Sequence, residues 1–411
     1  MKKLLGITLG IMTALGGFVD LGQIVFTLQA GALFDYRLIW SIVLGTAAII
    51  LYMEMCGRVA VVAKEPVFAI VRDRLPKPMG IVALVASNLL NVITCAAELG
   101  GIAIILHLLT GWPEKLLLAA AVVALFGMVA VLRFQWIERV FGMAGLLMLV
   151  AGVSALMLHP DWKALGWGLL PRTPGGNPGQ SLRYCFFAVG IFSAMLMEYE
   201  VHFYSSGALE EDWKPKDLPE NFMVASLGSV FGAGLTVALL AIGALVLLPR
   251  GIYPEQLTTA TLAIATPLGH RGLRLVLLGT LACLTGAAVE TMLSAGYNIC
   301  QFYNWPWGKT QKLRDVPVFT ASWMASLGVA ALLVLSGFRP LQLVNISVVF
   351  GMVVMPFTYY PILRVAMDKG VMGRHVNSRA DTIIGMVFLA LIAIAAVAAI
   401  PLMIATHSGK P

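Results

Sequence analysis

Residues 16–34 of this chain read GGFVDLGQIVFTLQAGALF, an apolar run that is interrupted once, by VDLGQ at residues 19–23. An ionisable side chain is costly inside a membrane helix, and by default it marks a functional site. A second apolar run is interrupted by MEYE at residues 197–200. Interrupted helices in matching positions of two halves indicate a transporter site near the middle of the membrane. Unwound backbone frees carbonyl groups and helix ends, which can then bind an ion in a dry medium.

The whole chain has the composition of a membrane protein. Of its 411 residues, 59% are hydrophobic and only 12% are charged, about half the charged fraction of a soluble domain. The mean hydropathy is +0.87, and apolar runs of about 20 residues, the length that crosses a bilayer as helix, recur along the chain. We therefore predict an all-α integral membrane protein with helices at about 4–33, 38–62, 79–108, 115–132, 136–158, 181–207, 221–248, 272–304, 316–336, 340–366 and 381–405.

The two interrupted helices are the first and the sixth in this series, which divides the chain into two sets of five. We predict one transmembrane domain over residues 1–411, with repeats of opposite orientation at about 4–158 and 181–366 and an extra helix at about 381–405. The start, MKKLLGITLG, is similar to a signal peptide, but apolar character resumes after Asp20. We therefore expect an uncleaved first helix.

Basic residues are spread unevenly over the connections between the predicted helices. With the N-terminus in the cytoplasm, most of the 28 Lys and Arg residues fall on the cytoplasmic side, as the positive-inside rule requires. We predict a multi-pass protein of the cell (inner) membrane, with its N-terminus cytoplasmic and its C-terminus outside. The net charge of +7 then follows from membrane topology, and no nucleic-acid partner is expected.

Several ionisable residues lie inside the predicted helices. Helices three and eight also carry polar stripes at helical spacing, whose amides and hydroxyls suit hydrogen bonds between helices. Glu98 and Glu290, which accompany these stripes, favour a functional role because a buried carboxyl group is costly. The ionisable set is Asp20, Glu54, Glu98, Glu198, Glu200, His202 and Glu290; the stripes are Asn88, Asn91 and Cys95 in helix three, and Thr291, Ser294, Asn298 and Gln301 in helix eight.

Asp20 is the strongest single candidate for binding a cation. It precedes Gly22, which tolerates unwound backbone, and Gln23, which offers an amide oxygen. Asp20 could equally cap the second half of its helix, and both roles can hold together. Met197 stands at the other interruption, where its thioether would be a soft ligand. His202 follows Glu198 by one helical turn, a spacing that suits either a structural salt bridge or a proton relay.

Short ordered motifs along most of the chain resemble the NRAMP (natural resistance-associated macrophage protein) family of divalent-metal transporters. DLGQ at 20–23, LQAGA at 28–32 and YRLIW at 36–40 resemble DPGN, QAGA and YRLLW of the family's first-helix signature. ELG at 98–100 is similar to the acidic site of its third helix. AMLMEY at 194–199 and the following Tyr204-Ser205 resemble ATxMPH…HS, SAGY at 294–297 resembles YAGQ, and residues 355–377 resemble the tenth helix and the loop after it.

The resemblance implies a LeuT-type fold of 5+5 inverted repeats with an eleventh transmembrane helix. It also implies import of a divalent cation such as Mn²⁺ or Fe²⁺, usually with proton symport. The metal ligands would be Asp20, Gln23 and Met197, with a carbonyl contributed near Ala194 and with Tyr199 in the same substrate site.

The chain also departs from the family pattern. Leu21 and Glu198 stand at family prolines, Tyr199 and Tyr204 at two histidines, and Cys95 at an acid one turn before Glu98. A proton pathway or second shell would therefore draw on Glu98, Glu198, Glu200, His202 and Glu290.

Three interpretations remain open from the sequence. The first is a divalent-cation importer, in which Met197 favours Mn²⁺ or Fe²⁺ and the added carboxylates favour a harder ion such as Mg²⁺. The second is a transporter of the same fold for a small organic solute. The third is a non-transporting membrane protein or intramembrane enzyme; since no nucleophile–base pair, HExxH or phosphate loop is present, we expect no enzyme. We expect no cofactor, the metal being substrate, and a monomer in the lipid bilayer.

Overall fold

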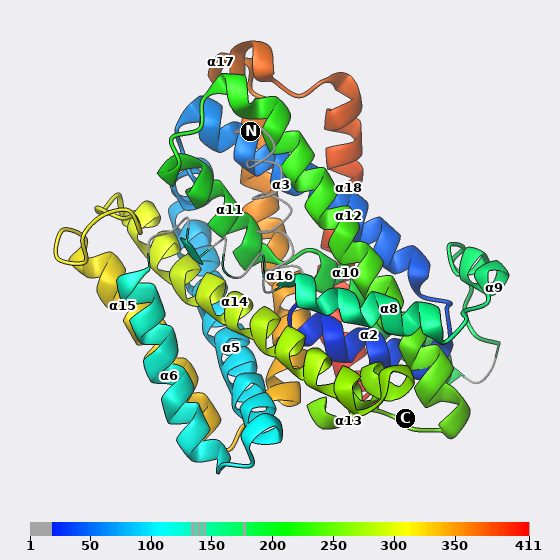
Figure 1. The fold of residues 1–411 in the computed structure, drawn as a ribbon. Coiled ribbons are helices and arrows are strands. Elements are labelled where there is room, and N and C mark those ends of the chain that lie inside the picture. The colour runs from blue at the N-terminus through cyan, green and yellow to red at the C-terminus, as the bar shows by residue number, and fades with distance from the viewer. Residues whose placement is uncertain are drawn as a thin grey trace.

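The computed structural model describes residues 19–132, 136–137, 140, 143, 145–175 and 178–410, and its regular elements there are all helical. Within this part of the chain, nine helical segments are long and apolar enough to cross a membrane, and α2 is a shorter apolar helix. Figure 1 shows them as one tilted bundle. The helices are α2 (Leu21–Phe34), α3 (Ile39–Ala63), α4 (Val67–Arg74), α5 (Lys77–Thr110), α6 (Glu114–Val131), α8 (Leu149–Met157), α9 (Trp162–Trp167), α10 (Pro178–Met195), α11 (Glu198–Glu210), α12 (Leu218–Ile242), α13 (Leu257–Ala265), α14 (Gly269–Tyr303), α15 (Pro317–Leu335), α16 (Pro340–Ala366), α17 (Lys369–Met372) and α18 (Arg379–Ala405).

The predicted helices agree with the observed ones wherever the structure describes them. The first prediction, about 4–33, extends over residues 1–18, which lie outside the described residues; its second half is α2. The fifth, about 136–158, is described in part, by the 3₁₀ turn Leu146–Met148 and by α8. The short helices α4 and α9 in the connections were not predicted.

The sixth predicted helix is divided as expected, but the division is shorter than the sequence indicated. Only Leu196 and Met197 separate α10 from α11. Glu198, Tyr199 and Glu200, which we had placed in the interruption, form the first turn of α11. Acidic side chains stabilise the first turn of a helix because they face the positive end of its dipole. Glu198 and Glu200 therefore stabilise the start of α11 and do not belong to the unwound segment.

Small residues let α2 approach α12 at backbone contact. A Cβ atom added to Gly31 of α2 would lie 2.1 Å from the carbonyl oxygen of Leu240 in α12. A Cβ added to Gly243, in the π-helical turn Gly243–Leu247 that follows α12, would lie 2.4 Å from the carbonyl oxygen of Leu28. Glycines at such crossings are typical of membrane helices. This contact fixes the position of the helix that begins just after Asp20.

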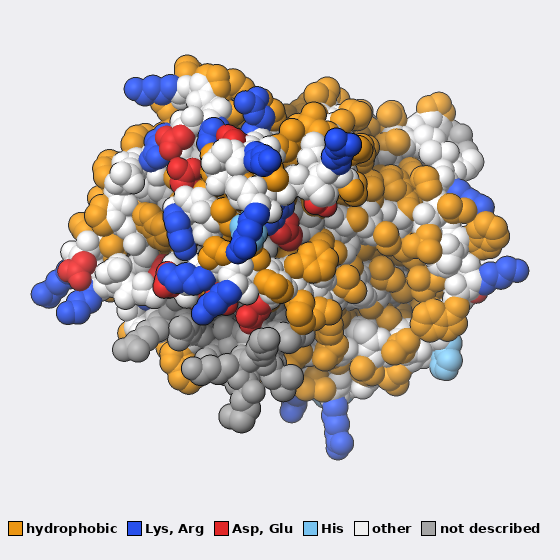
Figure 2. All heavy atoms as spheres, turned by 90° about the horizontal axis from the view of Figure 1, so that it is seen from above, with side chains coloured by type: hydrophobic (Ala, Val, Ile, Leu, Met, Phe, Trp, Pro, Cys, Tyr) orange, Lys and Arg blue, Asp and Glu red, His pale blue; other side chains and the backbone are white. Residues whose placement is uncertain are grey.

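One end of the bundle carries a concentration of basic side chains. Figure 2 views the molecule from above Figure 1 and shows Lys and Arg gathered on this face, beside a broad apolar surface. Anionic lipid headgroups and the positive-inside rule both favour such a distribution on the cytoplasmic face. The exposed basic residues of the connections at this end are Lys64, Arg74, Lys77, Lys214, Lys216, Lys312, Arg314, Lys369 and Arg374.

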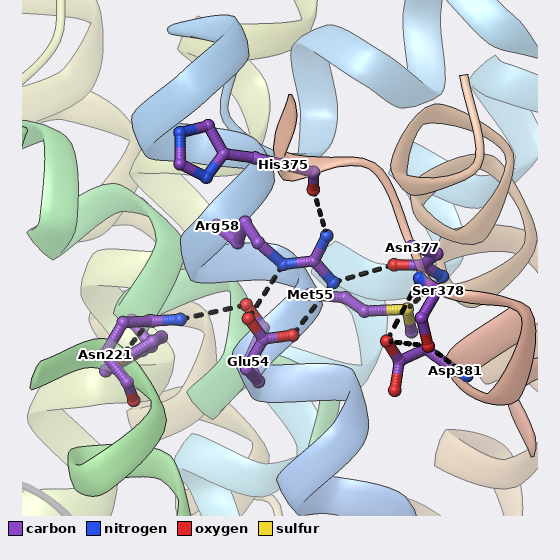
Figure 3. Close-up of polar contacts among 9 residues, drawn as sticks. Glu54, Met55, Arg58, Asn221, His375, Asn377, Ser378 and Asp381 are labelled. Atoms are coloured by element: carbon purple, nitrogen blue, oxygen red, sulfur yellow. Dashed lines mark hydrogen bonds and ion pairs between the residues drawn. The ribbon is translucent and has the colours of Figure 1, made fainter. Parts of the chain in front are cut away.

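At the same end, Glu54 and Arg58 of α3 together join this helix to two other parts of the chain (Figure 3). The Arg58 guanidinium donates to both carboxylate oxygens of Glu54, at 2.8 and 3.0 Å. It also donates to the carbonyl oxygen of His375 at 2.6 Å and to Oδ1 of Asn377 at 2.7 Å, both in the connection between α16 and α18. Asn221 of α12 donates to the Glu54 carbonyl oxygen at 3.0 Å. The Arg58 network therefore ties α3 to α12 and to this connection.

We expect Arg58→Ala to lower the stability of the protein by about 2 kcal/mol, a value between those of exposed and buried ion pairs, because it leaves the Glu54 carboxylate, which is 18% exposed, without its partner. The measurement is thermal unfolding of the purified protein in detergent. Arg364→Ala is the matched control, since Arg364 is exposed and, among the described residues, its guanidinium donates to the Tyr360 hydroxyl alone, at 3.3 Å. Equal melting temperatures of the two variants would contradict the prediction.

Candidate functional site

Asp20 lies at the start of α2, where it caps the helix. Its backbone is extended, and its Oδ1 accepts the backbone N–H of Gln23 at 2.7 Å. The capping interpretation of Asp20 is therefore confirmed. Only one carboxylate oxygen is used in this way, and Asp20 is 7% exposed. Its Oδ2 remains directed toward the second interrupted helix.

Tyr199 connects the two interruptions. Its hydroxyl lies 3.2 Å from Asp20 Oδ2 and 2.8 Å from the sulfur of Met197. Met197 immediately precedes α11, and Tyr199 is in the first turn of that helix. The two side chains that the sequence indicated as charged and soft ligands thus lie on either side of one hydroxyl group.

Gln23 is the third side chain that the sequence indicated as a metal ligand. Its Nε2 donates to the carbonyl oxygen of Ala194 at 3.1 Å and lies 3.7 Å from the sulfur of Met195. Gln23 is fully buried, and its Oε1 has no hydrogen-bond partner among the described residues. A buried amide oxygen without a donor is unfavourable, and it is available to a ligand. The structure therefore brings Asp20, Gln23, Ala194, Met197 and Tyr199 together.

The surroundings of this cluster are strongly acidic. Glu98 of α5 accepts the backbone N–H of Leu21, next to Asp20, at 3.1 Å. Glu200 directly follows Tyr199 in α11, and Glu290 lies one turn before Ser294, whose hydroxyl donates to the Tyr199 carbonyl oxygen. Across the described part of the chain, however, no three His, Cys, Asp or Glu side chains converge closely enough to hold a metal. Any cation bound here would rely on Asp20 together with neutral donors.

Glu198 and His202 form a second contact in α11. Glu198 Oε1 accepts the Ser87 hydroxyl at 2.7 Å and lies 3.5 Å from His202 Nε2. That second distance is too long for a good hydrogen bond. The His202 ring also meets the ring of Phe68 edge-on, with 5.1 Å between centroids. The pair is buried and is held by α5 and α4.

Glu200 and Glu290 are buried carboxyl groups that lack full hydrogen bonding. Neither oxygen of Glu200, nor Oε2 of Glu290, has a partner within the described ranges. Ser294, one turn after Glu290, donates to the carbonyl oxygen of Tyr199 at 3.0 Å. This bond places the α14 polar stripe beside the start of α11.

A profile of the family described as "Natural resistance-associated macrophage protein-like" matches residues 10–401, nearly the whole chain. The chain belongs to the NRAMP family. Among its curated relatives, the divalent metal cation transporter MntH of Deinococcus radiodurans is 26% identical over 393 residues, covering 91% of this chain and 85% of that protein. MntH of Bacillus subtilis is 23% identical over 389 residues, covering 91% and 87%.

Solved structures of NRAMP and related transporters share the fold. The manganese transporter of Eremococcus coleocola, solved with an aromatic bis-isothiourea substituted compound, gives a TM-score of 0.74 at 18% identity over 99% of this chain and 87% of that chain. MhsT in complex with L-phenylalanine gives 0.62 at 16% identity over 98% of both chains. The predicted LeuT-type, all-α membrane fold is confirmed, and membership of a transporter family agrees with the prediction that the chain is not an enzyme.

In α5 of this NRAMP protein, the sequence did not indicate Ser87 as a partner of Glu198, and it placed Asn88 wrongly on the polar face. Ser87 binds Glu198, whereas Asn88, which we had assigned to the buried stripe of helix three, is half-buried and donates to the carbonyl of Leu84 in its own helix, at 2.8 Å. Ser87, Asn91 and Glu98 are separated by four and seven residues, a spacing that keeps one helical face. Applying that spacing strictly would have identified Ser87.

Proposed function

We propose that this NRAMP protein imports a divalent metal cation, which binds between Asp20 and Met197 where α2 and α11 begin. The observation that supports the proposal is that one hydroxyl group, that of Tyr199, meets both predicted ligands. It lies 3.2 Å from the Asp20 carboxylate and 2.8 Å from the Met197 sulfur. A cation leaving water needs a fixed negative charge in a dry site, and Asp20 supplies it. The names of the MntH relatives support the same cargo.

The donor set favours Mn²⁺ or Fe²⁺ over Mg²⁺. Asp20 offers a carboxylate, Gln23 an unpartnered amide oxygen, Ala194 a carbonyl, and Met197 a thioether. Thioethers bind softer transition-metal ions, whereas Mg²⁺ takes oxygen ligands and keeps several waters. We assign Asp20, Gln23 and Met197 as ligands, with Ala194 and Tyr199 in contact with the ion.

Proton coupling forms a further part of the proposal. Glu98 is the candidate proton carrier, because it is bonded to the residue next to Asp20. Glu200 and Glu290 extend the acidic surroundings of the site. The Glu198–His202 pair lies in the same half-helix. We assign these five residues to the proton pathway or the second shell of the site.

We place the basic face of Figure 2 in the cytoplasm. The distribution of Lys and Arg along the sequence then puts the N-terminus in the cytoplasm and the C-terminus outside, in a cell (inner) membrane. Repeats at about 4–158 and 181–366 put one interrupted helix in each half, followed by an extra helix at about 381–405. One monomer contains a complete site, since every donor named above comes from the same chain.

Uptake of Mn²⁺ by proteoliposomes that contain the purified protein tests the proposal. We expect uptake well above that of protein-free liposomes, with competition by Cd²⁺ at much lower concentration than by Mg²⁺ or Ca²⁺. The reason is that only the softer competitor gains from the Met197 thioether. Absence of uptake and of Mn²⁺ binding to the purified protein would contradict the proposal and leave an organic solute as the cargo to examine.

A further inference from the structure

We propose that Tyr199 sets the ion selectivity of the site, because its hydroxyl covers the Met197 sulfur and offers a hard oxygen in place of a soft ligand. This inference rests on the proposed function and names the residue that decides which class of divalent cation the site prefers. It follows from three features of Tyr199: its fixed position, the two groups that its hydroxyl meets, and the charge around it.

The position of the Tyr199 ring is fixed by its neighbours. The residue is 3% exposed and belongs to the first turn of α11, two residues after Met197. Its backbone carbonyl accepts the Ser294 hydroxyl from α14, at 3.0 Å. A buried aromatic side chain that is anchored in this way has little freedom to turn aside. In the absence of a bound ion, the hydroxyl therefore lies against the Met197 sulfur.

The Tyr199 hydroxyl has one proton and two candidate acceptors. They are the Met197 sulfur at 2.8 Å and Asp20 Oδ2 at 3.2 Å. A phenol can donate its single proton to only one acceptor at a time, and a thioether is the weaker acceptor. Whichever group receives the proton, the hydroxyl oxygen stays against the sulfur. A cation at Asp20 thus meets the hydroxyl oxygen first, and it reaches the Met197 thioether only by displacing that hydroxyl.

This arrangement affects soft and hard cations differently. A hard ion such as Mg²⁺ gains nothing from sulfur and can accept the Tyr199 oxygen or a water held by it. A soft ion such as Cd²⁺ must displace the hydroxyl before it can bind the thioether. Tyr199 therefore lowers the affinity for soft ions while leaving that for hard ions equal or higher. The variant Tyr199→Phe removes the hydroxyl and changes no formal charge, so the Asp20 carboxylate remains available to both ions.

The experiment is calorimetric titration of the purified full-length protein with Cd²⁺ and, separately, with Mg²⁺. Tyr199→Phe is expected to tighten Cd²⁺ binding by roughly fivefold to tenfold, the range given by release of one hydrogen bond, and to leave Mg²⁺ binding unchanged or weaker. In a Met197→Leu background, which keeps the side-chain volume, Tyr199→Phe should no longer improve Cd²⁺ binding. This cycle isolates the coupling between the hydroxyl and the sulfur.

Tyr204→Phe is the matched control. Tyr204 lies in the same half-helix, but its hydroxyl donates to Asn221 Oδ1 at 2.7 Å, toward α12. It should leave the ratio of Cd²⁺ to Mg²⁺ affinity unchanged. The inference is overturned if Tyr199→Phe alters both affinities by one factor, if its effect persists without the sulfur, or if Tyr204→Phe reproduces it. In those cases the proposed function still stands, provided that the wild type binds Cd²⁺ and that this binding depends on Asp20. If the wild type shows no such binding, both proposals fail together.

Discussion

Uptake of Mn²⁺ should fall more than about 100-fold when Asp20 is replaced by Asn. At 4 Å and an effective dielectric constant near 20, each positive charge of the cation is attracted to the Asp20 carboxylate by about 4 kcal/mol. A change of about 1.4 kcal/mol corresponds to a factor of ten in the binding constant. Asparagine can still accept the Gln23 N–H that caps α2. The helix should therefore persist while the charge that holds the cation is lost. The measurement is initial uptake into proteoliposomes, together with equilibrium Mn²⁺ binding.

Asp35→Asn is the matched control for this substitution. Asp35 follows the other end of α2, so the same charge is removed from the same 14-residue helix. Its backbone φ is +55°, and because asparagine has the same shape as aspartate, the substitution adds no new backbone strain. We expect near-normal uptake in this variant. Normal uptake by Asp20→Asn, or an equal loss in both variants, would rule out Asp20 as the ligand that fixes the ion.

Replacement of Glu98 by Gln should abolish the proton movement that accompanies metal uptake. Burial penalises a charged carboxyl group, and a cation nearby stabilises its ionised form. Glu98 Oε1 accepts the N–H of Leu21, adjacent to Asp20, so arrival of a cation at Asp20 acts directly on this group. Glutamine retains an oxygen for the Leu21 N–H but cannot exchange the proton. Vesicles loaded with a pH-sensitive dye measure the acidification that Mn²⁺ drives.

In this assay Glu114→Gln serves as the control, because Glu114 is exposed in the first turn of α6. We expect acidification with the wild type and with Glu114→Gln, and background acidification with Glu98→Gln while metal uptake continues. Strong acidification that survives Glu98→Gln would remove Glu98 from the pathway. Uptake without acidification in the wild type would identify a uniporter.

Hydropathy and the two interruptions made most of the fold predictable. Transmembrane helices must satisfy their backbone hydrogen bonds internally, so each long apolar run predicts one helix with little dependence on its neighbours. The ranges at about 38–62, 79–108 and 340–366 accordingly match α3, α5 and α16. Asp20 and Met197 were also identifiable, because a charged or flexible interruption is conspicuous in an apolar run.

The sequence by itself therefore determined the membrane class, the positions of the helices and the identity of the cluster that begins α2 and α11. Only the tertiary structure decided which atoms of that cluster meet. Tyr199 and Asp20 are 179 positions apart, and Leu21 and Glu98 are 77 apart. Local hydropathy carries no information about such pairs, because they depend on how helices cross and rotate against one another. The backbone contact of Gly31 with Leu240 sets one such crossing, of α2 against α12, and the Ser294 hydroxyl of α14 holds the start of α11 at the Tyr199 carbonyl oxygen.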